Sequence, residues 1–267
     1  MDASRQSVPI LHNPGMARQP RLCVPGLPHL VLLSAAAASQ PLALEAQRWR
    51  FLAWLVDGLG SFPVQLHAYC VLPEAVWLLL TPERPAALSG LMQMLARRTS
   101  RALGGPVKPR GDAAKQAGVP EAQQQGSPAR PAVWAGRFRS AVLQPQAWLL
   151  PAMVWVDTAA QREGLADAGQ PWSWSSHAAH CGLGGALGSA PALHGPQPYW
   201  MLGNTPFERE AAYSRLLQAG VDADRAGALQ RALRSGTGLG DAAFLAELEL
   251  RSGRSVRPAR RGRPRKG

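Results

Sequence analysis

The chain has 267 residues, 46% of them hydrophobic, which is typical of a globular protein with one or two domains and a sizeable core. Its three cysteines are widely spaced and form no C-x-x-C pair, so the sequence excludes a disulfide framework and a zinc site and is typical of an intracellular protein. No apolar run approaches the roughly 18 residues of a membrane-spanning helix, and the net charge of +12 favours a polyanionic partner or a membrane surface.

The N-terminal region resembles a secretory signal only superficially. Residues 1–20 show no periodicity and are expected to form a loose leader. Residues 30–38, LVLLSAAAA, mimic the apolar part of a signal peptide, but they begin late and follow Pro25 and Pro28. We therefore expect a cytoplasmic protein.

Residues 21–165 predict an α+β core. The pattern indicates a strand over 27–33, a helix over 44–59, two strands over 64–81, a helix over 85–103, a strand over 132–143 and a helix over 148–157. The first six of these elements follow the βαββαβ order of a ferredoxin-like fold with an antiparallel sheet.

Apolar spacing predicts which face of three elements is buried. In the helix over 44–59 the stripe is formed by Leu44, Trp49, Leu52, Leu55 and Val56. In the first strand of 64–81 one face is formed by Val64, Leu66, Ala68, Cys70 and Leu72. In the helix over 85–103 the shared face is formed by Leu88, Leu91, Met92, Leu95 and Ala102.

The rest of the chain divides into an insertion and a C-terminal extension. Residues 104–131 are rich in Gly, Pro, Ala and Gln and hold no apolar residue larger than valine, so we expect a disordered insertion within the core. Residues 166–250 predict a mostly helical extension with helices over 207–218, 223–233 and 239–250. Asp222 or Asp224, and Asp241, are suitable N-caps for the last two helices.

The C-terminal tail, residues 251–267, contains eight basic residues and no acidic one, so the rest of the chain has a net charge of only +4. Its Gly-Arg-Pro core with flanking arginines resembles an AT-hook, in which an extended chain inserts arginines into a narrow A·T minor groove. Non-specific phosphate binding and a solvated, disordered end remain alternatives.

The segment 64–82, VQLHAYCVLPEAVWLLLTP, resembles the HUH-type single-tyrosine transposases of the insertion-sequence-200-like class, in the branch of the REP-associated tyrosine transposases. The matching positions are His67-Ala68-Tyr69, Pro73, Val76 and Leu78-Leu79-Leu80-Thr81-Pro82. Further collinear matches fall at 21–29, 134–140, 162–165, 174–177, 198–200 and 202–205. The resemblance therefore extends over about residues 18 to 218 and implies the ferredoxin-like fold.

The catalytic positions of that family are replaced here. The family's His-x-His pair, which places two imidazoles on one divalent metal, falls on Ala75 and Trp77, neither of which offers a metal ligand. The tyrosine positions fall on Thr99 and Ala102, and a family asparagine falls on Gly104. We therefore expect no catalytic residue, no metal site and no cofactor.

The combined expectation is a nucleoid-associated DNA-binding protein that no longer cleaves DNA. The alternatives are an active transposase that nicks and rejoins hairpin DNA, and a mobile-element remnant without function. The resemblance implies a homodimer and single-stranded hairpin DNA as partner, the tail implies A·T-rich duplex DNA, and no membrane partner is expected. The expected DNA contacts are Arg97, Arg98, Arg101, Arg137, Arg139, Arg260, Arg261, Arg263, Arg265 and Lys266.

Overall fold

The computed structural model describes residues 21–37, 39–104, 132–184 and 190–256. The expected leader, nearly all of the expected insertion over 104–131 and the tail from residue 257 lie outside the described residues. Within the described part of the chain, no helix is long and apolar enough to cross a membrane.

A five-stranded sheet forms the centre of the molecule, in the order β2-β3-β1-β4-β5. Its strands are β1 (His29–Ser34), β2 (Val64–Val71), β3 (Ala75–Pro82), β4 (Arg139–Leu143) and β5 (Gly238–Leu239). β1 pairs antiparallel with β3 and β4, and β2 pairs antiparallel with β3. This arrangement confirms the ferredoxin-like α+β core. The sheet is not wholly antiparallel, because the short β5 pairs parallel to β4.

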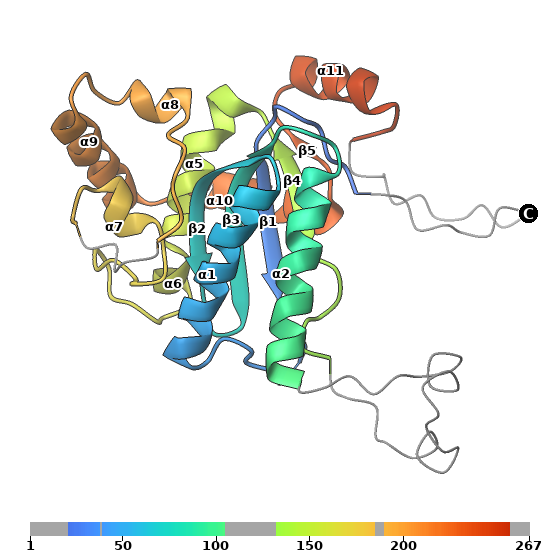
Figure 1. Cartoon of the computed structure of the whole chain (residues 1–267). Coiled ribbons are helices and arrows are strands. Elements are labelled where there is room, and N and C mark those ends of the chain that lie inside the picture. The colour runs from blue at the N-terminus through green and yellow to red at the C-terminus, as the bar shows by residue number, and fades with distance from the viewer. Residues whose placement is uncertain (1–20, 38, 105–131, 185–189, 257–267) are drawn as a thin grey trace, which may run out of the picture.

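Helices cover both faces of the sheet (Figure 1). α1 (Glu45–Ser61) and α2 (Ala87–Gly104) pack on one face, and α5 (Pro145–Asp157) and α10 (Ala223–Ser235) pack on the other. We call these the α1/α2 face and the α5/α10 face. Each face is covered by its own buried apolar cluster, so the sheet is sandwiched between two hydrophobic layers.

The side chains of β2 do not share one face as predicted. Val64 and Leu66 face α1 and α2, whereas Ala68, Cys70 and Leu72 face α5. The pairing of β2 with β3 shifts register between Leu66 and Ala68. A bulge of one residue moves every later side chain to the opposite face of the sheet, so a strict period of two fails here.

The buried face of α1 also differs from the predicted stripe. Leu44 and Val56 are 64% and 40% exposed. The buried residues are Arg48, Phe51, Leu52, Leu55 and Gly58. Arg48 is buried because its guanidinium lies 3.9 Å from the centroid of the Trp174 ring and donates to the Leu42 carbonyl at 2.7 Å.

The strand expected over 132–143 is shorter than predicted. Only Arg139–Leu143 forms β4, and residues 132–138 are irregular apart from an isolated bridge between Ala35 and Trp134. Gly136 adopts a φ of +129°, which interrupts the extended backbone. Arg137 therefore precedes the strand, and the prediction of a strand over 132–143 is wrong for its first seven residues.

The three helices predicted for the C-terminal part of the chain are present, and among the described residues three short helices that were not predicted precede them. The helices of this part are α6 (Ala159–Arg162), α7 (His177–His180), α8 (Gln197–Trp200), α9 (Pro206–Ala219), α10 and α11 (Ala242–Ser252). Asp222 and Asp241 are the N-caps of α10 and α11, as predicted, and accept from the backbone N–H groups of Arg225 and Phe244. α11 begins at residue 242 rather than 239, because Gly238–Leu239 joins the sheet as β5.

Two buried histidines are held in their neutral form. Each ring donates from Nδ1 to a backbone carbonyl. His29 Nε2 accepts from a backbone N–H, which leaves no acceptor for a second ring proton, and His67 Nε2 meets a hydroxyl. The pairs are His29 Nδ1 to Leu27 O at 2.8 Å, Val24 N to His29 Nε2 at 3.2 Å, His67 Nδ1 to His194 O at 2.8 Å and Thr81 Oγ1 to His67 Nε2 at 2.8 Å. Burial lowers the pKa of both imidazoles to about 4.

Acidification is therefore expected to destabilise the protein between about pH 6.5 and pH 4. Above pH 6.5 the two imidazoles are neutral in the folded and in the unfolded protein. Below pH 6.5 they bind protons in the unfolded protein but stay neutral in the folded one, so protonation favours unfolding. Each histidine should cost about 3 kcal/mol of unfolding free energy across this range. Urea denaturation at pH 7.5, 6 and 5 measures how the unfolding free energy depends on pH. His67→Asn should reduce this dependence by the contribution of one histidine. An unchanged dependence in that variant would contradict the conclusion that His67 is neutral in the folded protein.

Candidate nucleic-acid interface

The two positions that align with the metal-binding histidines lie at the start of β3. Ala75 is half-buried and Trp77 is 9% exposed. Trp77 faces α5, where its ring meets Trp155 edge-on with centroids 6.3 Å apart. Among the described residues, no three His, Cys, Asp or Glu side chains gather as metal ligands. A methyl group and an indole offer no ligand to the divalent metal that the sequence resemblance implies.

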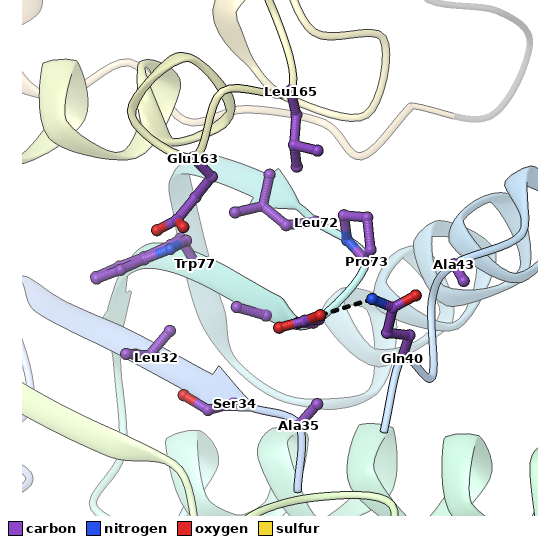
Figure 2. A pocket seen from close by; sticks show the side chains of 12 residues that line it. Leu32, Ser34, Ala35, Gln40, Ala43, Leu72, Pro73, Trp77, Glu163 and Leu165 are labelled. Carbon is purple, nitrogen blue, oxygen red and sulfur yellow. Dashed lines mark hydrogen bonds between the residues drawn. The ribbon is translucent and has the colours of Figure 1, made fainter. Parts of the chain in front are cut away.

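A cavity of about 620 Å³ opens beside these two positions, and we call it the β1–β3 pocket (Figure 2). Its lining combines apolar side chains with two carboxylates. It consists of Leu32, Ser34, Ala35, Gln40, Ala43, Leu72, Pro73, Glu74, Ala75, Trp77, Glu163 and Leu165. Gln40 Nε2 donates to Glu74 Oε1 at 2.7 Å, the dashed line in Figure 2.

The positions that align with the family tyrosines do not offer a nucleophile. Thr99 is 2% exposed, and its hydroxyl donates to the Leu95 carbonyl at 2.9 Å, within α2. Ala102, predicted to share the buried face of this helix, is exposed instead. A buried, hydrogen-bonded threonine with no adjacent base is a poor attacking group.

Arginines from distant parts of the chain line a second hollow of about 540 Å³, which we call the arginine groove. Arg139 lines it at the start of β4, Arg137 just before that strand, and Arg234 in the last turn of α10. The arginines of the groove are Arg21, Arg137, Arg139, Arg234 and Arg254, and no Asp or Glu is among its lining residues. An adjoining hollow of about 600 Å³ shares Arg21 and Arg254 and adds Arg251.

The predicted DNA contacts fall into three groups. Arg137 and Arg139 line the groove, whereas Arg97, Arg98 and Arg101 lie on α2 and do not. Arg98 Nη1 pairs with Asp57 Oδ2 of α1 at 2.7 Å, and Arg97 and Arg101 are exposed. Arg260, Arg261, Arg263, Arg265 and Lys266 lie outside the described residues.

Sequence reasoning missed Arg21 and Arg234 as candidates. Neither residue sits in a basic run, and they are brought together only by the fold. The one local signal for Arg234 was its place in the last helical turn, where a cation is favourable beside the free carbonyls.

The pocket and the groove lie side by side on the sheet. Leu32 of β1 is in register with Trp77 of β3 on one side and with Arg139 of β4 on the other. Residues in register point to the same face, and Leu32 packs on the α5/α10 face. Since neighbouring strands are about 4.8 Å apart, the Cα atoms of Trp77 and Arg139 are separated by about 10 Å.

Comparison with known proteins gives little beyond this geometry. No family model matches the sequence, and no curated protein matches it. Among solved structures, a REP-associated tyrosine transposase bound to a REP hairpin aligns with a TM-score of 0.46 and 15% identity, over 67% of this chain and 99% of that chain. A likeness at that level does not establish family membership, and the fold assignment rests on the strand order described above.

Proposed function

We propose that this protein binds DNA through the arginine groove and does not cleave it. The observation that carries the proposal is the lining of the groove: five arginines from four separate segments, without a single carboxylate. Arginine guanidinium groups match phosphate oxygens in charge and geometry, and phosphate contacts supply most of the sequence-independent affinity for DNA. The sequence resemblance to the transposases of hairpin DNA supports single-stranded hairpins as the class of target.

The basic tail is proposed to extend this surface. The described chain ends at Val256, whose carbonyl accepts from Gly238 of β5 at 3.0 Å, and Arg254 lines the groove. The tail therefore begins beside the groove, and its Gly-Arg-Pro core supports a preference for A·T-rich duplexes. On the sequence resemblance alone, we also propose a homodimer associated with the nucleoid.

The absence of cleavage is proposed from three side chains. Ala75 and Trp77 supply no metal ligand, and the Thr99 hydroxyl is buried and already donates to a carbonyl. Strand cleavage by a covalent intermediate needs an activated nucleophile and charge stabilisation at the phosphate. Neither requirement is met by these residues.

Incubation of the full chain with labelled hairpin DNA and magnesium or manganese tests both halves of the proposal. We expect a mobility shift on a native gel and no covalent protein–DNA adduct when the same sample is run on a denaturing gel. An adduct would identify an active transposase. A missing shift at low salt would identify a remnant without DNA affinity.

A further inference from the structure

The β1–β3 pocket has the size and walls of a small-molecule site. Its volume of about 620 Å³ lies within the range of roughly 300 to 1,000 Å³ that is common for such sites. Leu32, Leu72 and Leu165 provide apolar walls, and the short side chain of Ala75 leaves the space beside Trp77 open. A flat, largely apolar ring system suits these walls.

Two polar groups in the pocket have no side-chain hydrogen bond among the described residues. The Trp77 indole N–H donates none, and the Glu163 carboxylate accepts none and forms no salt bridge. Burial lowers the pKa of the neighbouring Arg162 guanidinium to about 10, and the charge of Glu163 opposes this shift. Glu74, by contrast, is held by Gln40. Figure 2 shows the Glu163 carboxylate and the Trp77 indole among the side chains that line the cavity. The pocket therefore presents one donor and one charged acceptor.

We propose that the β1–β3 pocket receives one unpaired nucleobase of a bound single strand, with Trp77 Nε1–H donating to the base edge and the Glu163 carboxylate accepting from it. The proposal rests on the DNA binding proposed above. Every nucleobase carries an acceptor next to a donor on its Watson–Crick edge, and only an unpaired base has that edge free. A paired base in a duplex does not qualify.

The distribution of charge decides which part of a nucleotide enters the pocket. Glu74 and Glu163 repel a phosphate, so the backbone does not occupy the pocket itself. The arginine groove begins one strand beyond Leu32, about 10 Å from Trp77 between Cα atoms. One strand can thus place a base in the pocket and neighbouring phosphates on Arg137 and Arg139.

The test compares a single strand of eight nucleotides with an abasic strand of the same length. Both strands carry the same phosphates, so the ratio of their affinities for the full chain reports base contacts alone. We expect the wild-type chain to bind the base-bearing strand about tenfold more tightly, the scale of one well-placed set of base contacts. Glu163→Ala should bring this ratio down to about two- to threefold. Glu83→Ala removes an exposed carboxylate at the other end of β3 and should leave the ratio unchanged.

A spectroscopic readout keeps the test independent of affinity. In protein labelled with 5-fluorotryptophan, Trp77→Phe identifies the Trp77 fluorine resonance among the nine tryptophans. That resonance should shift with the base-bearing strand and remain in place with the abasic strand.

The outcomes separate the two proposals. Equal affinity for both strands, or an unchanged ratio in Glu163→Ala, overturns the nucleobase pocket and leaves the DNA-binding proposal intact. No binding of either strand at low salt overturns the proposed function itself. A shift of the Trp77 resonance with spermidine but not with the base-bearing strand would show that the pocket takes an organic cation, and the nucleobase pocket would then be wrong.

Discussion

Replacing Asp157 with alanine is expected to lower the unfolding free energy by about 3 to 5 kcal/mol, because each buried donor that loses its acceptor costs about 1 to 3 kcal/mol. The carboxylate is 1% exposed, at the C-terminal end of α5. It accepts hydrogen bonds from the Ser176 hydroxyl, from His180 Nδ1 at 2.6 Å and from the Tyr213 hydroxyl at 2.7 Å. Its removal leaves the buried donors of His180 and Tyr213 without an acceptor, while the Ser176 hydroxyl keeps the Tyr69 carbonyl at 3.2 Å. The hydrogen bonds that join α7 and α9 to α5 are then lost.

Denaturant unfolding of matched variants measures this effect. Tyr213→Phe removes a single donor and should cost about 1 to 2 kcal/mol. Asp167→Ala removes an exposed carboxylate and should change stability by less than about 0.5 kcal/mol. A loss below about 1 kcal/mol for Asp157→Ala would show that the network does not hold these helices to the core.

The order of the elements could be predicted from the sequence because the signals were local. Alternating apolar residues indicated the strands, and Asp222 and Asp241 marked the starts of α10 and α11 through a side chain that caps its own helix. Local chemistry also showed that Ala75 and Trp77 offer no metal ligand.

The features that the sequence did not predict depend on contacts between distant segments, or on single residues that interrupt the alternation of side chains along a strand. The bulge in β2 displaces His67, whose ring is held by Thr81 and by the carbonyl of His194. The Asp157 network joins three helices, because the donors to this carboxylate of α5 come from α7, its N-cap residue Ser176 and α9, and no sequence motif indicates these contacts. β5 has only two residues and exists because α10 returns the chain to the free edge of β4.

The candidate site likewise combines residues that have a local sequence signal with residues that only the fold brings together. Arg137 and Arg139 were predicted from their place on a strand of the transposase-like core, but their neighbours Arg21 and Arg234 lie roughly a hundred residues away on either side. No pattern along the chain reports such a convergence. The β1–β3 pocket likewise combines Glu163 of the segment after α6 with Trp77 of β3, and only the packing of α5 on the sheet brings them together.

Replacing Arg137, Arg139 and Arg234 together with alanine is expected to weaken binding of single-stranded hairpin DNA by about a hundredfold at moderate salt. Each lost phosphate contact should also flatten the dependence of log affinity on log salt by about 0.9, so the slope should change by up to about three units. All three side chains are exposed at the groove, so the fold should survive their truncation.

A matched variant separates the groove from net charge. Arg50, Arg84 and Arg215 are exposed and do not line the groove, and replacing them with alanine removes the same three charges. A chain ending at Val256 removes residues 257–267 of the tail without cutting α11, and it should lose duplex affinity while retaining single-strand binding.

The most direct test of DNA binding at the arginine groove is fluorescence anisotropy of labelled hairpin DNA across a series of salt concentrations, with the wild-type chain and the two triple variants measured side by side. We predict that the groove variant loses about a hundredfold in affinity and up to three units of salt slope, while the control variant stays within about threefold of the wild type. Equal losses in both triple variants would contradict the account, because binding would then follow net charge and not the groove.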